Sequence, residues 1–174
     1  MRTCFLIFFC VFFAAIVHAE QFCKPESIPA STPDSQLVDN GNGTVTDSIT
    51  GLMWKKCLEG LSGDNCESGT PEDYLTWLDA LQRPDAVNDA GGFAGYRDWR
   101  LPNINELVSL VEEQCSDPAI NLNRFPNTPS SDVWSGSPHA DLDNSSWCVS
   151  FSAGSFFAKP RRNNGTVRLV RGGK

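Results

Sequence analysis

The chain has 174 residues and a formal net charge of −7 at pH 7. Such an acidic chain is a poor general binder of nucleic acids and of heparin-like polymers, because these ligands are polyanions. Its length suits a single domain with an adequate hydrophobic core.

Residues 1–19 have the composition of a secretory signal peptide. Arg2 supplies the positive charge, residues 5–17 form an apolar run too short for a comfortable membrane span, and Ala19 ends a cleavage-site pattern. We therefore expect an exported protein with no membrane insertion after signal removal, located in the periplasm, at the cell surface or in the medium. An uncleaved membrane anchor is the alternative.

Two of the seven cysteines lie in the signal peptide, and disulfides are the default interpretation for the others in an exported chain. Cys57 and Cys66 bracket a polar Gly/Ser/Asn loop that closes easily, so we expect them to pair. We pair Cys23 with Cys115; a Cys115–Cys148 bridge, which would leave Cys23 free, is the competing arrangement. After the signal there is no Cys-x-x-Cys pair and one histidine, which disfavours zinc. We expect no metal and no cofactor.

Residues 20–36 are rich in Pro and Ser and lack periodicity, so we expect an extended N-terminal segment before a domain at 37–174. At the start of this domain, residues 40–43 (Asn-Gly-Asn-Gly) separate two short apolar runs and predict a β-hairpin. The two glycines of this loop break the oxygen-ligand spacing of a calcium site. Residues 52–54 predict a short buried strand.

The first predicted helix begins after Thr70, with Pro71 at its first position and Asp73 three residues after the cap. Pro84 is expected to end this helix. The apolar stripe with helical spacing consists of Tyr74, Trp77, Leu78 and Leu81.

The tract 95–107, Gly-Tyr-Arg-Asp-Trp-Arg-Leu-Pro-Asn-Ile-Asn-Glu-Leu, joins an aromatic, arginine-rich turn to a second helix. Asn103 is a good N-cap, and Glu106 can accept a hydrogen bond from the cap's backbone amide. The apolar spacing extends this helix to about residue 114. We expect Trp99 to be buried and Arg100 to be structural, since an arginine among aromatic rings usually satisfies loop carbonyls and stacks on the rings.

After the second helix, short apolar segments alternate with clusters of Ser, Asn, Gly and Asp. Trp147, Val149 and Phe151 alternate with small or polar residues, which predicts one buried and one exposed strand face. A hairpin to residues 156–157 and a closing strand at 167–170 complete the pattern. Two helices followed by a small antiparallel sheet indicate an α+β fold.

Together with residues 39–47, 50–54 and 167–173, the tract 95–107 resembles the Lcl C-terminal domain family, which is named for a collagen-like adhesin of Legionella and was formerly a domain of unknown function. Several separate motifs in the right order make the resemblance specific. A weaker likeness is to the formylglycine-generating-enzyme and C-type-lectin-like folds, so the resemblance implies a C-type-lectin-like single domain. The residues that would form its structural motif are Trp54, Tyr96, Trp99, Arg100 and Glu106.

The sequence contains no complete catalytic motif, and we predict that the protein is not an enzyme. Formylglycine-generating enzymes bind copper through two closely spaced cysteines, whereas Cys148 stands alone in the corresponding region. Ser135, His139 and Asp141 have the residue types of a hydrolytic triad, but no nucleophile-elbow sequence accompanies them.

Paired carboxylates are equally weak candidates for acid–base chemistry. Glu112 and Glu113 are expected on the solvated side of the second helix, and Asp141 and Asp143 in a loop. Glycoside hydrolysis requires two carboxyl groups held across a bond, with one of them desolvated. Neither pair meets this requirement, so we assign no catalytic residue.

The remaining candidate is a binding surface in residues 135–166, where adaptable polar groups accompany aromatic residues, as in antibody paratopes. Because Val149 and Phe151 are expected to point inward, Ser150 and Ser152 should point outward on the same strand. A shallow face of this kind suits a glycan or a protein surface better than a deep-pocket substrate. The predicted ligand-contacting residues are His139, Asp141, Asn144, Ser150, Ser152, Phe157, Arg161 and Asn163.

The family resemblance implies adhesin-like binding of glycans, and many relatives are diversified by retroelements that mutate exposed positions. In this chain such a mechanism would vary His139, Cys148, Ser150 and Ser152 and would leave Trp147 fixed. The adhesin relative works as a trimer, so the resemblance also suggests a homotrimer. The alternatives are a structural or interaction module of a surface assembly, and an enzyme of the formylglycine-generating type.

The signal peptide is directly testable. We expect the exported protein to begin at Glu20, because an apolar segment ending in Ala19 is a substrate for signal peptidase. N-terminal sequencing of the exported chain measures this. A sequence starting at Met1 would show that the segment is an anchor.

Overall fold

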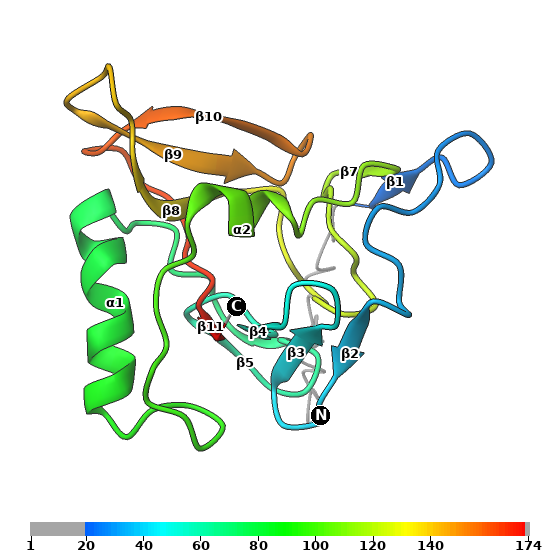
Figure 1. Cartoon of the computed structure of the whole chain (residues 1–174), viewed down its shortest axis with the longest axis horizontal. Coiled ribbons are helices and arrows are strands. Elements are labelled where there is room, and N and C mark those ends of the chain that lie inside the picture. The colour runs from blue at the N-terminus through cyan, green and yellow to red at the C-terminus, as the bar shows by residue number, and fades with distance from the viewer. Residues whose placement is uncertain (1–19, 173–174) are drawn as a thin grey trace, which may run out of the picture.

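The computed structural model describes residues 20–172, which form eleven strands and two helices (Figure 1). The signal peptide expected at residues 1–19 lies outside the described residues. The elements in chain order are β1 (Phe22–Cys23), β2 (Leu37–Asp39), β3 (Thr44–Asp47), β4 (Leu52–Lys55), β5 (Leu61–Ser62), β6 (Ser68–Gly69), α1 (Trp77–Asp89), α2 (Ile104–Val108), β7 (Cys115–Ser116), β8 (Asp132–Pro138), β9 (Ser145–Ser150), β10 (Ser155–Pro160) and β11 (Val170–Gly172).

A four-stranded antiparallel sheet joins the two ends of the domain, in the strand order β11-β4-β3-β2. The hairpin expected around residues 40–43 is present between β2 and β3, and the strand expected at 52–54 is β4. The closing strand begins later than expected, at Val170 rather than Val167. Residues 167–169 still run beside the end of β4, because the carbonyl oxygens of Val167 and Leu169 accept hydrogen bonds from Glu59 and Lys55.

A three-stranded antiparallel sheet follows in the strand order β10-β9-β8. It forms the upper layer of the molecule in Figure 1, with α2 lying between it and the four-stranded sheet. Leu107 of α2 is fully buried between these layers. It packs in one apolar cluster with Val45 and Trp54 of the four-stranded sheet and with Val133 and Val149 of the three-stranded sheet. The two sheets therefore share one core.

Two disulfides hold the loops, and both match the expected pairing. Cys57–Cys66 closes a short loop with a sequence separation of 9, and Cys23–Cys115 spans a separation of 92. The second bridge joins β1 to β7, which pair as a two-stranded sheet. It thereby ties the N-terminal segment to the region after α2. The competing Cys115–Cys148 bridge is not formed, and Cys148 carries a free, buried thiol.

Helix α1 differs from the prediction at both ends. It begins after Thr76 instead of Thr70, because Thr76 and Asp79 form a reciprocal capping box. Pro84, expected to end the helix, lies inside it and is buried. A proline removes one backbone hydrogen bond, but the turns after Pro84 are held from outside. The Asn88 side chain donates to the carbonyl oxygen of Trp99 and accepts from its backbone amide.

The shift of α1 also changes its buried face. Tyr74 lies before the helix and is 63% exposed, and Leu78 is 61% exposed. Ala80 and Pro84 form the fully buried side instead, with Trp77 and Leu81 half-buried against the core. The predicted apolar stripe therefore does not coincide with the buried face of α1, and two of its four residues point to solvent.

Helix α2 is capped as expected, by a box between Asn103 and Glu106, but it ends at Val108 instead of continuing to about residue 114. Turns follow, in which Val111 forms an isolated bridge with Ile120. This early end places Glu112 in the interior, with 2% of its surface exposed. The expectation that Glu112 is solvated was wrong, whereas Glu113 is exposed.

The tract around Trp99 is structural. Trp99 is 2% exposed, its indole Nε1 donates to the carbonyl oxygen of Phe93, and its ring meets the Phe93 ring edge-on. The Arg100 guanidinium donates to both carboxylate oxygens of Glu106 at 2.7 Å. The Arg171 guanidinium lies 3.7 Å from the centre of the Tyr96 ring. The turn before α2 is thus fixed to the C-terminal strand by aromatic and arginine contacts.

A fully buried arginine, Arg168, lies where several segments meet. Its guanidinium donates to the backbone carbonyl oxygens of Lys55 and Lys56 and to Thr128 Oγ1, and it covers the Phe125 ring at 4.7 Å. These contacts connect the C-terminal segment to the end of β4 and to the loop before β8.

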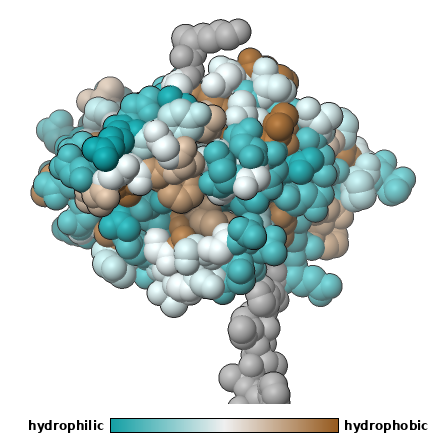
Figure 2. All heavy atoms as spheres, turned by 90° about the horizontal axis from the view of Figure 1, so that it is seen from below, coloured by the Kyte–Doolittle hydropathy of each residue, from teal (hydrophilic) through white to brown (hydrophobic). Residues whose placement is uncertain are grey.

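The chain is thus a small mixed α/β domain with two helices and several antiparallel sheets. Neither helix of residues 20–172 is long and apolar enough to cross a membrane. Seen from below, on the side away from the β10-β9-β8 sheet, hydrophilic residues cover most of the surface (Figure 2). Hydrophobic residues show there only in limited areas.

Replacing the Trp99 side chain tests the structural assignment of this tract. We expect Trp99→Ala to lower the free energy of unfolding by about 3–5 kcal/mol, the usual range for losing a buried aromatic side chain. Urea denaturation measures the loss. The control is Tyr74→Ala, an exposed aromatic residue, which should change stability by no more than about 0.5 kcal/mol. Similar losses in both variants would contradict the assignment.

Candidate functional site

The strand expected to present a binding face, β9, is packed on both sides. It is the central strand of its sheet, with β8 and β10 as neighbours. Cys148 is fully buried beside Trp134, and Val149 is fully buried on the opposite face. The prediction that Cys148 lies exposed was therefore wrong, which also removes it from the positions open to variation by surface diversification. Trp147, expected inside, is only half-buried.

Trp147 instead belongs to an aromatic row on the same face of the sheet as Val149. The rings of His139 and Trp147 are 4.6 Å apart, and those of Trp147 and Phe156 are 5.9 Å apart. Phe156 is 56% exposed. These spacings are those of interacting aromatic pairs. His139, Trp147 and Phe156 thus form a row, called the aromatic row below, that crosses from the end of β8 over β9 to β10.

A cavity of about 260 Å³ lies at the Phe156 end of the aromatic row. Its walls come from α2 and the turns after it and from the β9–β10 hairpin. Apolar side chains and polar groups share its lining about equally, and the carboxyl residues Glu112 and Glu113 are among the lining residues. Its lining residues are Val108, Val111, Glu112, Glu113, Cys115, Ala119, Ala153, Gly154 and Phe156. A ligand lying on the row therefore has a recess within reach at one end.

A second cavity, of about 380 Å³, lies at the other end of the sheet and is lined by Asn144, Pro160, Arg161 and Arg162. Arg161 is held in place there. Its Nε donates to Ser146 Oγ at 2.9 Å, and its guanidinium lies over the Trp77 ring at 4.3 Å. This arginine is a fixed hydrogen-bond donor beside an open recess.

The eight predicted contact residues do not form one surface. His139, Asp141, Asn144, Arg161 and Asn163 gather at the β8–β9 end of the sheet: the backbone amide of Asp141 donates to His139 Nδ1, and that of Arg161 donates to Asn144 O. Ser150 and Ser152 lie at the opposite end, where Ser152 Oγ donates to Asp117. Phe157 neighbours Phe156 on β10, so its side chain lies on the opposite face of the sheet.

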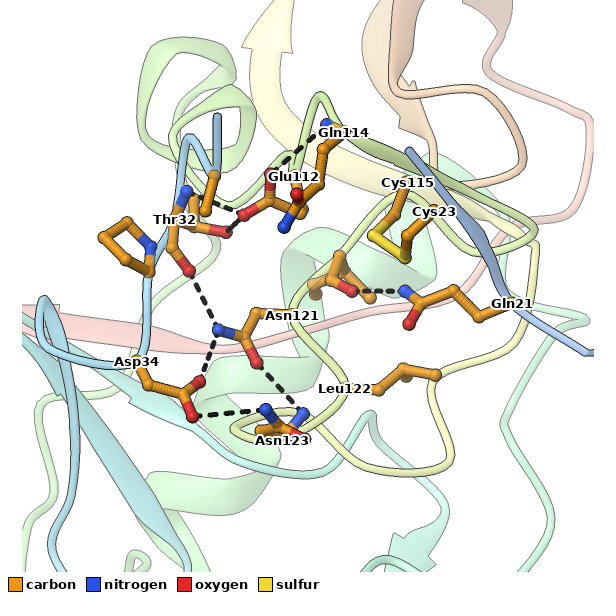
Figure 3. A pocket seen from close by; sticks show the side chains of 13 residues that line it. Gln21, Cys23, Thr32, Asp34, Glu112, Gln114, Cys115, Asn121, Leu122 and Asn123 are labelled. Atoms are coloured by element: carbon orange, nitrogen blue, oxygen red, sulfur yellow. Dashed lines mark hydrogen bonds between the residues drawn. A yellow bond between two sulfur atoms is a disulfide. The ribbon is translucent and has the colours of Figure 1, made fainter. Parts of the chain in front are cut away.

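A third cavity, of about 310 Å³, lies between the N-terminal segment and the turns after α2 (Figure 3). Its polar groups already bond to one another. Asn121 Nδ2 donates to Thr32 O and to Asp34 Oδ1, and Gln21 Nε2 donates to two backbone carbonyl oxygens. We interpret this cavity as a polar joint that fixes the N-terminal segment, since few of its donors remain for a ligand.

Glu112 is the centre of this joint. Its carboxylate accepts hydrogen bonds from the backbone amides of Ser31, Thr32 and Gln114. Burial alone would raise the pKa of Glu112, but these hydrogen bonds outweigh burial and lower the pKa below its ordinary value. The group is therefore ionised at neutral pH and serves a structural role.

The family comparison agrees with the fold and the motifs. A family model described as the Lcl C-terminal domain matches residues 43–171. The chain belongs to the Lcl C-terminal domain family. No curated protein matches it closely enough to count as a relative.

The hydrolytic residue types in this Lcl C-terminal domain are not assembled into a triad. Ser135 is buried, and its hydroxyl donates to the carbonyl oxygen of Trp147 instead of facing His139. Burial raises the pKa of the Cys148 thiol to about 12, so it is protonated at neutral pH. No cluster of three or more metal-ligating side chains occurs within residues 20–172.

Sequence reasoning missed the residues that carry the aromatic row of the Lcl C-terminal domain. Trp147 was assigned to the core from its alternation with Cys148, and Phe156 was treated only as part of a hairpin. One signal was present. β8, β9 and β10 form two successive hairpins, and His139, Trp147 and Phe156 lie directly after β8, on β9 and on β10. Cross-strand neighbours on one face contact one another.

The Glu112 joint makes a pH-dependent contribution to stability. Because the folded-state pKa is lowered, the contribution is present above the ordinary glutamate value of 4.5 and is lost as pH falls through the folded pKa. We expect Glu112→Gln to lower the free energy of unfolding by about 2 kcal/mol at pH 7, the scale of hydrogen bonds to a charged group. The difference from the parent should shrink in acid.

Urea denaturation between pH 7 and pH 3 measures this difference. Glu113→Gln is the matched control, since Glu113 is exposed. A stability gap for Glu112→Gln that is the same at every pH would show that the ionised carboxylate is not what matters.

Proposed function

We propose that this domain is an exported, non-enzymatic recognition module that binds a glycan or a protein surface across the aromatic row. The observation that supports the proposal is the continuous row of His139, Trp147 and Phe156, which ends at a cavity lined by both apolar and polar groups. Exposed aromatic rings give large, rigid contact areas at small entropic cost. The C–H faces of sugar rings pack on such aromatic surfaces, and peptide side chains do the same.

The polar residues at the β8–β9 end supply the specificity in this proposal. Asp141, Asn144 and Asn163 are exposed beside the fixed Arg161. Carboxylate, amide and guanidinium groups suit the hydroxyl groups of a sugar or the backbone of a peptide. The site would thus combine an apolar platform with a polar edge, as ligand-binding sites commonly do.

Two further features of the molecule support export and a binding role. The two disulfides favour an oxidising compartment. The Lcl family membership supports a C-type-lectin-like arrangement and a surface location. We extend the proposal to an adhesin-like role, in which the sites of several copies would act together.

The test is a glycan array followed by variants. We expect His139→Ala/Phe156→Ala to weaken binding of any ligand found by at least about tenfold, which corresponds to about 1.4 kcal/mol. Its melting temperature should stay close to the parent's, because Phe156 is exposed and His139 is half-buried. Tyr74→Ala, which removes an exposed aromatic side chain outside the site, is the control and should bind normally.

The polar edge is tested in parallel with Asn144→Ala/Asn163→Ala. We expect this variant to change which glycans bind more than how tightly the best one binds, because polar contacts set specificity. Parental binding by the aromatic variant would place the site elsewhere. Turnover of a substrate would refute the non-enzymatic assignment.

A further inference from the structure

The outer edge of β10 has no partner strand within residues 20–172. β10 pairs with β9 on one side only and lies at the rim of the upper sheet (Figure 1). A free edge presents unpaired N–H and C=O groups that can pair with another strand. The register of the β9–β10 pair decides which backbone groups of β10 face outward.

One contact shows which residues of β10 form backbone hydrogen bonds with β9. The backbone amide of Arg161 donates to Asn144 O, and these residues continue the register of the β9–β10 pair. Antiparallel pairs alternate between bonded and non-bonded residues, so Phe157 and Lys159 also bond toward β9. Phe156 and Ala158 therefore turn their N–H and C=O groups outward, away from β9.

This edge is protected only at its C-terminal end, where Pro160 has no N–H to turn outward. Natural edge strands are commonly guarded by a charged side chain, above all lysine. The single charged residue of β10, Lys159, is instead drawn back over the sheet, where Nζ pairs with Asp132 at 2.7 Å. Phe156 and Phe157 remain 56% and 37% exposed on opposite faces.

We propose that a second copy of this chain pairs with the outer edge of β10, antiparallel about a twofold axis that passes beside Phe157. In this register Phe156 lies opposite the partner's Ala158, and the outward groups of these residues form four backbone hydrogen bonds. The two Phe157 side chains meet at the axis. The edge is self-complementary, as a twofold interface requires.

Charge and chain chemistry favour this occupant and this direction. β10 contains no acidic residue, and the cationic residues Lys159, Arg161 and Arg162 lie at its C-terminal end and just after it. Antiparallel pairing places the two cationic ends at opposite ends of the ladder, whereas parallel pairing would bring them together. Pro160 has no N–H to donate, so it ends the ladder after the four bonds.

The pairing would join two three-stranded sheets into one of six strands. Phe156 points to the same face as Trp147 on each copy, so the two aromatic rows would lie on one continuous face. Two sites held together increase overall avidity without a new contact. The dimer does not depend on the proposed ligand binding, and the two can fail separately.

The first experiment measures mass against concentration for the oxidised chain from Glu20 onward, by sedimentation. We expect a monomer–dimer equilibrium that dissociates on dilution, because a strand-edge contact buries less area than a standard interface. Ala158→Pro removes one outward N–H, which an edge strand tolerates, and should weaken dimerisation by at least about tenfold. Tyr74→Ser, remote from the edge, should leave the equilibrium unchanged.

The second experiment reads the register. In a Cys148→Ala background, which removes the neighbouring thiol, Phe157→Cys should give a disulfide-linked dimer under mild oxidation, because residue 157 meets its counterpart at the axis. Ser155→Cys is the matched control and should not cross-link, since the register places it opposite the partner's Lys159. A monomer at every concentration, a trimer, or equal cross-linking of the two variants would overturn the proposal.

Discussion

The fold depends on the buried guanidinium of Arg168. It stands near the C-terminus, yet its hydrogen bonds end on the carbonyl oxygens of Lys55 and Lys56 and on Thr128. A buried charge is tolerated only when it is well bonded, so these two segments must lie together for the C-terminal segment to take its place. The same segment then fixes the Trp99 turn through Arg100, and α2 follows from that turn.

The sequence correctly predicted those features that depend on residues close together in the chain. The hairpin glycines, the Asn103 cap and the Cys57–Cys66 loop each involve residues close in sequence, and all are present. The start of α1, in contrast, depends on a contact with a segment outside the helix. The sequence predicted Thr70 as the cap, whereas Thr76 is the cap in the structure. The backbone amide of Glu72 donates to Glu59 O and so pairs with a distant segment instead of with a first helical turn.

The candidate site shows the same limit. Alternation along β9 was interpreted as one buried and one exposed face, but a central strand with packing on both sides alternates between two cores. The sequence does not say that α1, through Ala80, and α2, through Leu107, will pack on opposite faces of this sheet. The positions that stay exposed are those beyond the reach of the packed helices. Trp147 and Phe156 lie there, and both remain partly exposed.

The Cys23–Cys115 clasp has a consequence for the order in which the chain assembles as it emerges N-terminus first. Cys23 appears early, and its partner follows 92 positions later, after Cys57 and Cys66 have had time to close their short loop. Cys23 therefore stays unpaired until Cys115 has emerged. Cys148 follows later still and is buried in the middle of β9, so a bond to Cys148 in place of Cys115 would be incompatible with the folded sheet.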